Sequence, residues 1–470
     1  MKYKALFRCV AVCLIAAFFV ASCKTPGDVS TGLHIDGTTD SQGNTGSGSG
    51  TASLSGPNKT ATTSGQGTTS TSKPPQNTTT STTRNTKEKN VKNVIREEAI
   101  NLKLTEPVLQ RSIVDSGNMN RLAKVIRKAA LGEDVTIGVI GGSITEGTGA
   151  SPASNKYAEK FRAWWQATFN KSKLTFVNAG MGATDSMMGV HRADDDLLSK
   201  KPDLVIIEFS VNDYTTDSQL VKLYKEAYES LVRKILKQSN QPAVILLFLF
   251  NQSGGSMQSV HDDIGKHYSL PMISYKDAVW PKGSKVLYAW SELSGDSVHP
   301  NNTGHAIISE LLIYYINTVR EHIESIPENI PALPAPLTDA SFENGKLLNS
   351  MNFQAIKLGS FVVNYNAFWQ FKYGWTVSGG TQPIEFKYNA KNIYILYKRD
   401  KTSGKGGTVS VKLDGQVIGS INSDYSTSWG DHVYFYKVLD SNITGNHTVE
   451  IQLTSTSPKT DFAILGLMVS

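Results

Sequence analysis

Short apolar runs alternate with amphipathic segments through the middle of the chain. Four apolar runs predict buried strands, at residues 135–140, 174–178, 203–209 and 243–250. Five amphipathic segments predict helices, at residues 119–131, 157–169, 185–198, 219–237 and 303–323. Because such strands separated by helices are typical of βαβ units, we expect a parallel sheet with helices on both faces. Residues 91–325 are therefore predicted to form a three-layer α/β domain with a flavodoxin-like sheet.

The pattern changes after a proline-rich segment at residues 326–337, which predicts a stiff, extended linker. Beyond it, apolar residues recur at every second position, as in residues 392–397. A pair of such runs on either side of Asp414 and Gly415 predicts a hairpin. Residues 338–470 are therefore predicted to form an all-β sandwich.

The N-terminus carries targeting signals. Three basic residues precede an apolar run that is too short to span a bilayer comfortably, so residues 1–22 are interpreted as a signal peptide. The sequence Val20-Ala-Ser-Cys23 resembles the lipobox of bacterial lipoproteins, which implies that Cys23 is lipidated and begins the mature chain. Residues 23–90, rich in Ser, Thr and Gly, predict a flexible tether. We expect a lipid-anchored protein of the bacterial cell envelope, exposed outside the cytoplasm, with the membrane as a partner.

Charge and cysteine content exclude several classes of function. The chain has 47 basic and 41 acidic residues, and three of the basic ones belong to the leader, so the excess is too mild to indicate nucleic acid binding. The three cysteines, Cys9, Cys13 and Cys23, all lie in the leader, so the mature chain would keep only Cys23. A disulfide framework, a thiolate metal site and a cysteine nucleophile are therefore excluded. No His/Glu spacing indicates a zinc site, and we expect neither a metal nor another cofactor.

The first predicted strand ends in two glycines that are followed directly by Ser143. A serine at such a strand-to-helix turn faces free backbone N–H groups and the positive end of a helix dipole. A phosphate-binding P-loop would need Lys-Ser or Lys-Thr after Gly147, and an α/β-hydrolase elbow would need glycine in place of Thr145. The remaining interpretation is a looser Gly-x-Ser turn that presents a nucleophile.

Polar residues also follow the other predicted strands. Asn-Ala-Gly-Met-Gly-Ala-Thr occupies residues 178–184, Ser-Val-Asn-Asp occupies 210–213, and Gly-Asp-Ser-Val-His-Pro-Asn at 295–301 precedes the last helix. In parallel sheets, ligands bind beyond the carboxyl ends of the strands. Together with the Ser143 turn, these ordered blocks resemble the SGNH (GDSL-like) hydrolase family, over roughly residues 91–324.

The resemblance implies a role for each of five residues. Ser143 would be the nucleophile, with Asp296 and His299 completing the triad. The Ser143 and Gly182 N–H groups and the Asn212 amide would form the oxyanion hole.

Two residues depart from the family pattern, and one assignment has an alternative. Gly142 stands where the family commonly has aspartate, and Ser210 stands where it usually has glycine. In the second block, Gly180 is the alternative to Gly182 as the oxyanion donor.

The chemistry of these residues is consistent with acyl transfer. A neutral imidazole near pH 7 can take the proton of a serine hydroxyl. Because Asp296 lies three residues before His299, one turn can place its carboxylate against Nδ1 while Nε2 faces Ser143.

We therefore expect a surface serine esterase that removes O-acyl groups, often acetyl, from a polysaccharide. One alternative is a lysophospholipase or thioesterase of the same fold, and another is a non-catalytic glycan-binding lipoprotein. The linker favours a sandwich that is dispensable for hydrolysis of a small soluble ester. Five tryptophans are candidates either for sugar contact or for core packing: Trp280, Trp290, Trp369, Trp375 and Trp429.

Overall fold

The computed structural model describes residues 95–281, 286–454 and 460–470. The expected signal peptide, the lipidation site at Cys23 and nearly all of the tether lie outside these residues. Within the described ranges, no helix has the length and apolar character needed to cross a membrane.

The first folded region, which we call the α/β domain, is built on a six-stranded sheet in the order β1-β6-β5-β4-β2-β3. The strands are β1 (Ile113–Asp115), β2 (Val135–Gly141), β3 (Leu174–Gly180), β4 (Leu204–Glu208), β5 (Ala243–Phe248) and β6 (Met272–Ser274). Strands β2 to β6 pair in parallel, and β1 is an antiparallel edge strand. The predicted flavodoxin-like sheet is confirmed, because the parallel strands follow the 2-1-3-4-5 order of that fold.

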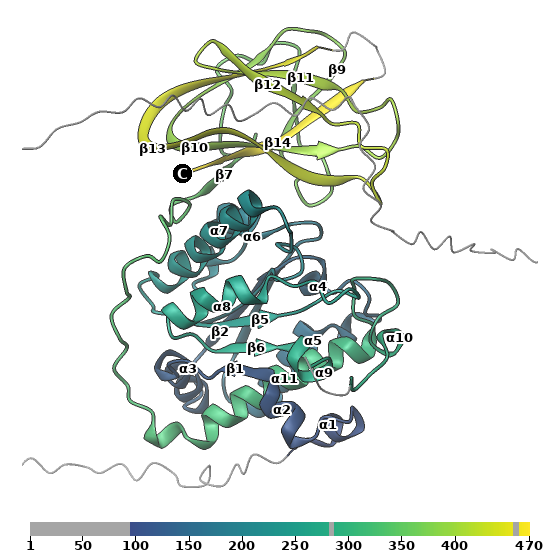
Figure 1. The fold of residues 1–470 in the computed structure, drawn as a ribbon. Helices are drawn as coiled ribbons and strands as arrows, with labels where there is room; N and C mark the ends of the chain where they lie inside the picture. Colours follow the sequence, from purple (N-terminus) through teal and green to yellow (C-terminus); the bar gives the residue numbers. More distant parts are fainter. Residues whose placement is uncertain (1–94, 282–285, 455–459) are drawn as a thin grey trace, which may run out of the picture. The chain divides into compact units, whose positions relative to one another are not determined.

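Helices cover both faces of this sheet (Figure 1). One face carries α3 (Asn120–Ala130), α5 (Tyr157–Thr168), α9 (Tyr275–Val279) and α11 (Asn302–Glu321), and the other carries α6 (Ser186–Asp196), α7 (Ser218–Leu236) and α8 (Gln258–His267). The short helices are α1 (Glu97–Asn101), α2 (Glu106–Ser112), α4 (Ser143–Glu146) and α10 (Trp290–Leu293). Because the strands are covered on both sides, their apolar runs are continuous rather than alternating.

Side-chain caps fix where the helices that border the carboxyl edge begin. Asp185 accepts a hydrogen bond from the Met188 N–H at the start of α6, and Asn301 accepts from the Thr303 and Gly304 N–H groups at the start of α11. These caps hold the chain just after the second and fourth sequence blocks.

The C-terminal region, which we call the β domain, is all-β, as expected, and its strands pair antiparallel. Its strands are β7 (Lys346–Leu348), β8 (Val362–Asn364), β9 (Gly374–Ser378), β10 (Ile384–Arg399), β11 (Thr408–Leu413), β12 (Gln416–Asn422), β13 (His432–Leu453) and β14 (Asp461–Val469). They form one hydrogen-bonded sheet rather than two separate ones, because β10 and β13 are long and pair along most of their length. Register shifts near Ala390 bend this pair around an apolar core that includes Trp375.

The β domain and the α/β domain share an apolar core. Phe342, Tyr394 and Phe435 belong to the same buried cluster as side chains of α6 and α7. The linker is also fastened, since Arg233 on α7 donates to the Pro334 carbonyl (2.9 Å) and pairs with Glu343. The shared core argues against the expectation of a dispensable β domain, because removal of this domain would expose that core to water.

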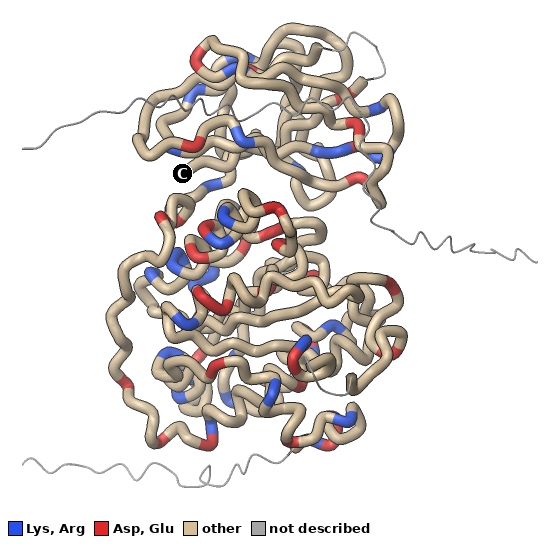
Figure 2. Tube along the Cα trace, viewed as in Figure 1, with Lys and Arg blue, Asp and Glu red and all other residues tan. Residues whose placement is uncertain are grey.

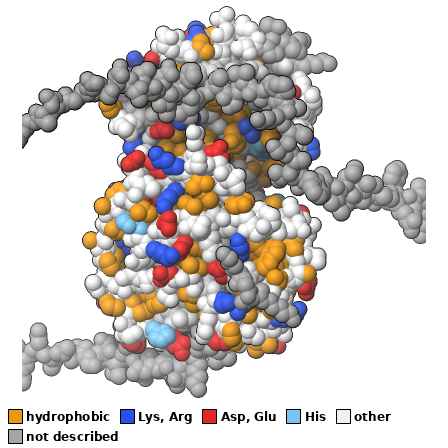
Figure 3. All heavy atoms as spheres, in the orientation of Figure 1, with side chains coloured by type: hydrophobic (Ala, Val, Ile, Leu, Met, Phe, Trp, Pro, Cys, Tyr) orange, Lys and Arg blue, Asp and Glu red, His pale blue; other side chains and the backbone are white. Residues whose placement is uncertain are grey.

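Charges of both signs are interspersed along the trace in both domains (Figure 2). The face drawn in Figure 3 likewise shows hydrophobic side chains between charged ones. Such a mixed surface fits the mild net charge of +6.

Candidate active site

Ser143, His299 and Asp296 form one chain of hydrogen bonds. Ser143 is the first residue of α4 and is separated from the end of β2 by Gly142 alone, and its Oγ lies 2.9 Å from Nε2 of His299. Nδ1 of His299 lies 2.8 Å from Oδ2 of Asp296. This order of contacts is the one needed for a serine nucleophile, its base and the carboxylate that orients the base.

The carboxylate of Asp296 is held in its charged form. Partial burial alone would raise its pKa, but the N–H groups of His299 and Val298 and the His299 ring outweigh this and lower the pKa below its usual range. Its Oδ1 accepts from these N–H groups at 2.6 Å and 2.7 Å, while Oδ2 faces the ring. A charged carboxylate at this position stabilises the imidazolium that forms during catalysis.

Neighbouring residues fix the loop that carries Asp296 and His299. Trp290 donates its indole N–H to the Asp296 carbonyl at 2.6 Å, and Gln252 donates its backbone N–H to the Ser297 carbonyl at 2.9 Å. The hydroxyl of Ser294 lies 2.7 Å from the Asp296 carbonyl. The triad loop is therefore held both by α10 with the residue that follows it and by the segment after β5.

Asn212 lies against the glycine that precedes the nucleophile. A Cβ built on Gly142 would be only 2.1 Å from Oδ1 of Asn212, so the amide occupies the space that a side chain would need. The departure from the family pattern at this position therefore has a packing reason. At the other departure, the Ser210 hydroxyl accepts from the Leu249 N–H (2.7 Å) and lies 3.1 Å from its carbonyl, which ties the end of β4 to the end of β5.

The second sequence block is arranged differently from the expectation. The Gly182 N–H donates to Oε2 of Glu146 at 2.9 Å, and the Gly180 N–H donates to Oδ1 of Asn178 at 2.8 Å. Both glycine N–H groups are thus engaged within the protein, which disfavours the expected role of Gly182 as an oxyanion donor. Ala183 adopts a left-handed conformation (φ 56°), and its N–H has no hydrogen-bond partner among the described residues.

Comparisons with known proteins agree with this geometry. A family model described as the GDSL-like Lipase/Acylhydrolase family matches residues 139–307, which contain all four blocks. A solved structure of a two-domain esterase (CEX) active on acetylated mannans, co-crystallised with mannopentaose, is 31% identical, with a TM-score of 0.70. The match covers 77% of this chain and 97% of that one. The chain belongs to the GDSL-like lipase/acylhydrolase family.

A second structure of that two-domain esterase, without the mannopentaose, gives the same result. It is 31% identical, has a TM-score of 0.71, and is matched over 77% of this chain and 98% of its own length. Among curated proteins, none matches this chain. As a GDSL-like acylhydrolase, the protein is a carboxylic ester hydrolase.

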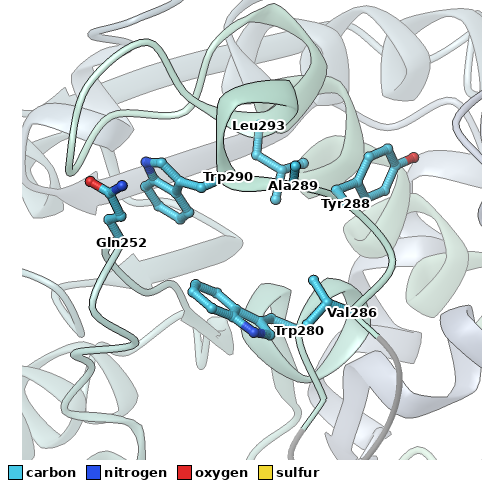
Figure 4. Close-up of a pocket in the computed structure, with 7 residues that line it drawn as sticks. All are labelled: Gln252, Trp280, Val286, Tyr288, Ala289, Trp290 and Leu293. Atoms are coloured by element: carbon cyan, nitrogen blue, oxygen red, sulfur yellow. The ribbon is translucent and has the colours of Figure 1, made fainter.

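Beside the triad loop of this GDSL-like enzyme lies an apolar cavity of about 270 Å³ (Figure 4). Its lining residues are Gln252, Trp280, Val286, Tyr288, Ala289, Trp290 and Leu293. The indoles of Trp280 and Trp290 lie 6.3 Å apart, and Phe250 packs edge-on against both. Both tryptophans therefore line a cavity, and Trp290 is also bonded to the triad loop.

The β domain reaches the same site through its β8–β9 loop. Gln370 donates to Oε1 of Glu146 at 2.7 Å, and a Cβ on Gly182 would lie 2.8 Å from the Trp369 indole. Trp369 is 54% exposed and Trp429 is 72% exposed, whereas Trp375 is 1% exposed. Trp375 is thus a core residue and cannot stack on a sugar, while the other two can.

Proposed function

We propose that this GDSL-like hydrolase is a serine esterase that removes acetyl groups from a polysaccharide outside the cytoplasm. The observation that carries the proposal is the continuous chain from Ser143 Oγ through the His299 ring to the Asp296 carboxylate, with contacts of 2.9 Å and 2.8 Å. Such a chain activates a serine hydroxyl for attack on an ester carbonyl.

The reaction would proceed through an acyl-enzyme. Ser143 Oγ attacks the ester carbonyl carbon while His299 Nε2 takes the hydroxyl proton. The tetrahedral intermediate collapses when the imidazolium returns this proton to the leaving sugar oxygen, and the acetyl group stays on Ser143. Water then attacks the acyl-enzyme with His299 again as base, which releases acetate and restores the serine.

Three donors would stabilise the negative oxygen of each tetrahedral intermediate. The Ser143 N–H is at the start of α4, where no intrahelical partner exists. The Asn212 side chain lies beside it, against Gly142. The third donor is the Ala183 N–H, which takes the place that the sequence assigned to Gly182. One such donor is typically worth about 10²–10³ in rate.

The substrate class follows from the surroundings of the triad. Exposed Trp369 and the cavity lined by Trp280 and Trp290 offer flat apolar surfaces, and such surfaces suit the apolar faces of pyranose rings. The similar two-domain esterase acts on acetylated mannans, which supports an acetylated polysaccharide here. The lipobox-like Val20-Ala-Ser-Cys23 supports a location at the cell envelope, where such polymers are met.

Substitution of the nucleophile tests this proposal. Ser143→Ala should lower kcat on a small acetyl ester and on acetylated mannan by several powers of ten, with an unchanged unfolding temperature. A panel of esters graded by acyl length should show a preference for acetate. Retention of activity within tenfold of wild type in Ser143→Ala would refute the mechanism, and a preference for long acyl chains would refute the substrate class.

A further inference from the structure

A buried carboxylate that the proposed reaction does not use lies next to the oxyanion site. Asp213 directly follows Asn212 and is fully buried. Its Oδ1 accepts a hydrogen bond from the Ser186 N–H at 2.8 Å, and its Oδ2 lies 3.1 Å from Nε2 of His261. Burying a carboxylate is costly unless its oxygens are bonded, so this arrangement calls for a reason.

The bond from Ser186 to Asp213 joins two turns of the chain. Ser186 is the first residue of α6, three residues after Ala183. Asn212 is the residue before Asp213 on the turn that follows β4. One side chain therefore joins the turn that carries the Asn212 amide to the turn that carries the Ala183 N–H.

A rigid aromatic pair backs this carboxylate. The His261 ring stacks on the Tyr228 ring with centroids 3.6 Å apart and an interplanar angle of 6°. Burial lowers the pKa of His261 to about 3, so the ring is neutral near pH 7. Burial raises the pKa of Asp213 to about 8. The contact between Oδ2 of Asp213 and Nε2 of His261 holds Oδ2 in place, and Oδ1 is left for the Ser186 N–H.

The capping residue of α6 belongs to the same network. Asp185 accepts from the Met188 N–H at 2.9 Å and from the Tyr224 hydroxyl at 3.2 Å. The start of α6 is thus held on one side by its own cap and on the other by Asp213.

We propose that Asp213 is a positioning residue that sets the separation of the two oxyanion donors carried by Asn212 and Ala183. It touches neither Ser143 nor His299, so it acts through these donors. The inference rests on the proposed function, because it assigns a support for the same oxyanion hole. Displacement of either donor by a fraction of an ångström weakens its bond to the transition state more than its contact with the substrate.

Two variants of Asp213 test the proposal. Asp213→Ala removes the acceptor for the Ser186 N–H, whereas Asp213→Asn keeps one. The Ala variant should lower kcat by roughly 10²-fold with little change in KM, and the Asn variant should recover most of that loss. Affinity for a boronic acid, which forms a tetrahedral adduct with an active serine, should fall in parallel with kcat.

A double variant separates this role from general destabilisation. If Asp213 acts through the donors, Asn212→Ala combined with Asp213→Ala should lose much less than the product of the two single losses. Multiplicative losses, or a kcat for Asp213→Ala within threefold of wild type, would overturn the inference.

A backbone variant covers the case in which Asp213→Ala does not fold. Ser186→Pro removes the same N–H at the first position of α6, where proline is tolerated, and Ser186→Ala keeps the N–H as the matched control. Loss of kcat in the proline variant alone supports the proposal, and equal activity of the two overturns it. If Ser143→Ala stayed active, the proposed function itself would fail; if it is inactive while the Asp213 variants are active, only this inference fails.

Discussion

Restoration of the family's aspartate before the nucleophile should inactivate this enzyme. In Gly142→Asp, the new Cβ would lie 2.1 Å from Oδ1, 2.6 Å from Cγ and 2.8 Å from Nδ2 of Asn212. Non-bonded heavy atoms need more than about 3 Å, so the amide must retreat by roughly 1 Å. The φ of −88° at Gly142 is negative, so the position does not require glycine for a left-handed conformation.

The cost should therefore fall on catalysis rather than on folding. The atoms that must move are the end of a half-buried side chain, which can shift at a cost of under about 1 kcal/mol. The same atoms supply one oxyanion donor, whose loss costs about 10²–10³ in kcat, or roughly 3–4 kcal/mol. KM should change little, because the donor serves the transition state.

Steady-state kinetics on 4-nitrophenyl acetate, together with thermal unfolding followed by circular dichroism, would measure both effects. Gly142→Ala is the smallest version of the change and should show a loss of the same kind. In the Asn212→Ala background the obstructing amide is gone, so Gly142→Asp should cost little more there. A Gly142→Asp enzyme with kcat within threefold of wild type would refute the proposed placement of the Asn212 donor.

Three further predictions concern other parts of the chain. Burial raises the pKa of Glu208 to about 8, so the folded state keeps a proton that the unfolded state releases above its ordinary pKa. Stability should fall as pH rises through that window, and Glu208→Gln should flatten the fall in Tm between pH 5 and pH 8; an equal slope in both proteins would contradict the pKa. A protein truncated after Ile326 should aggregate or lose small-ester activity, and full activity in a folded monomer would show that the shared core is dispensable. Wild type should incorporate labelled fatty acid and Cys23→Ala should not; equal labelling would exclude the lipid anchor.

The α/β fold could be predicted because its strands are buried on both faces. The four predicted strands match β2, β3, β4 and β5 to within a few residues. Strands β1 and β6 were missed because each has only three residues, too few to establish a period. In the β domain, the run at residues 392–397 predicted only part of β10, since polar residues interrupt the alternation along the rest of that strand.

In the candidate site, residues that act through a side chain could be predicted, whereas a residue that acts through its backbone N–H could not. Ser143, Asp296 and His299 were predictable because each contributes a distinctive side chain. The proposed donor at Ala183 could not be predicted, because a backbone N–H has no residue type to signal it. The choice between the N–H groups of Gly182 and Ala183 depends on which of them already has a hydrogen-bond partner. The partner of Gly182 is the Glu146 carboxylate on α4, an element far from Gly182 in the sequence.

The position of α6 explains why the β domain and the oxyanion site should depend on each other. Its first residue bonds to Asp213, directly after the turn that carries Ala183. Further along, the His191 ring packs on Phe342 at 5.7 Å, and Lys234 of α7 donates to both the Val190 carbonyl on α6 and the Gly345 carbonyl before β7. One helix thus begins at the oxyanion turn and has the β domain packed along it. A change in that packing can shift α6 and with it the donor, so variants in this interface should lower kcat before they lower substrate affinity.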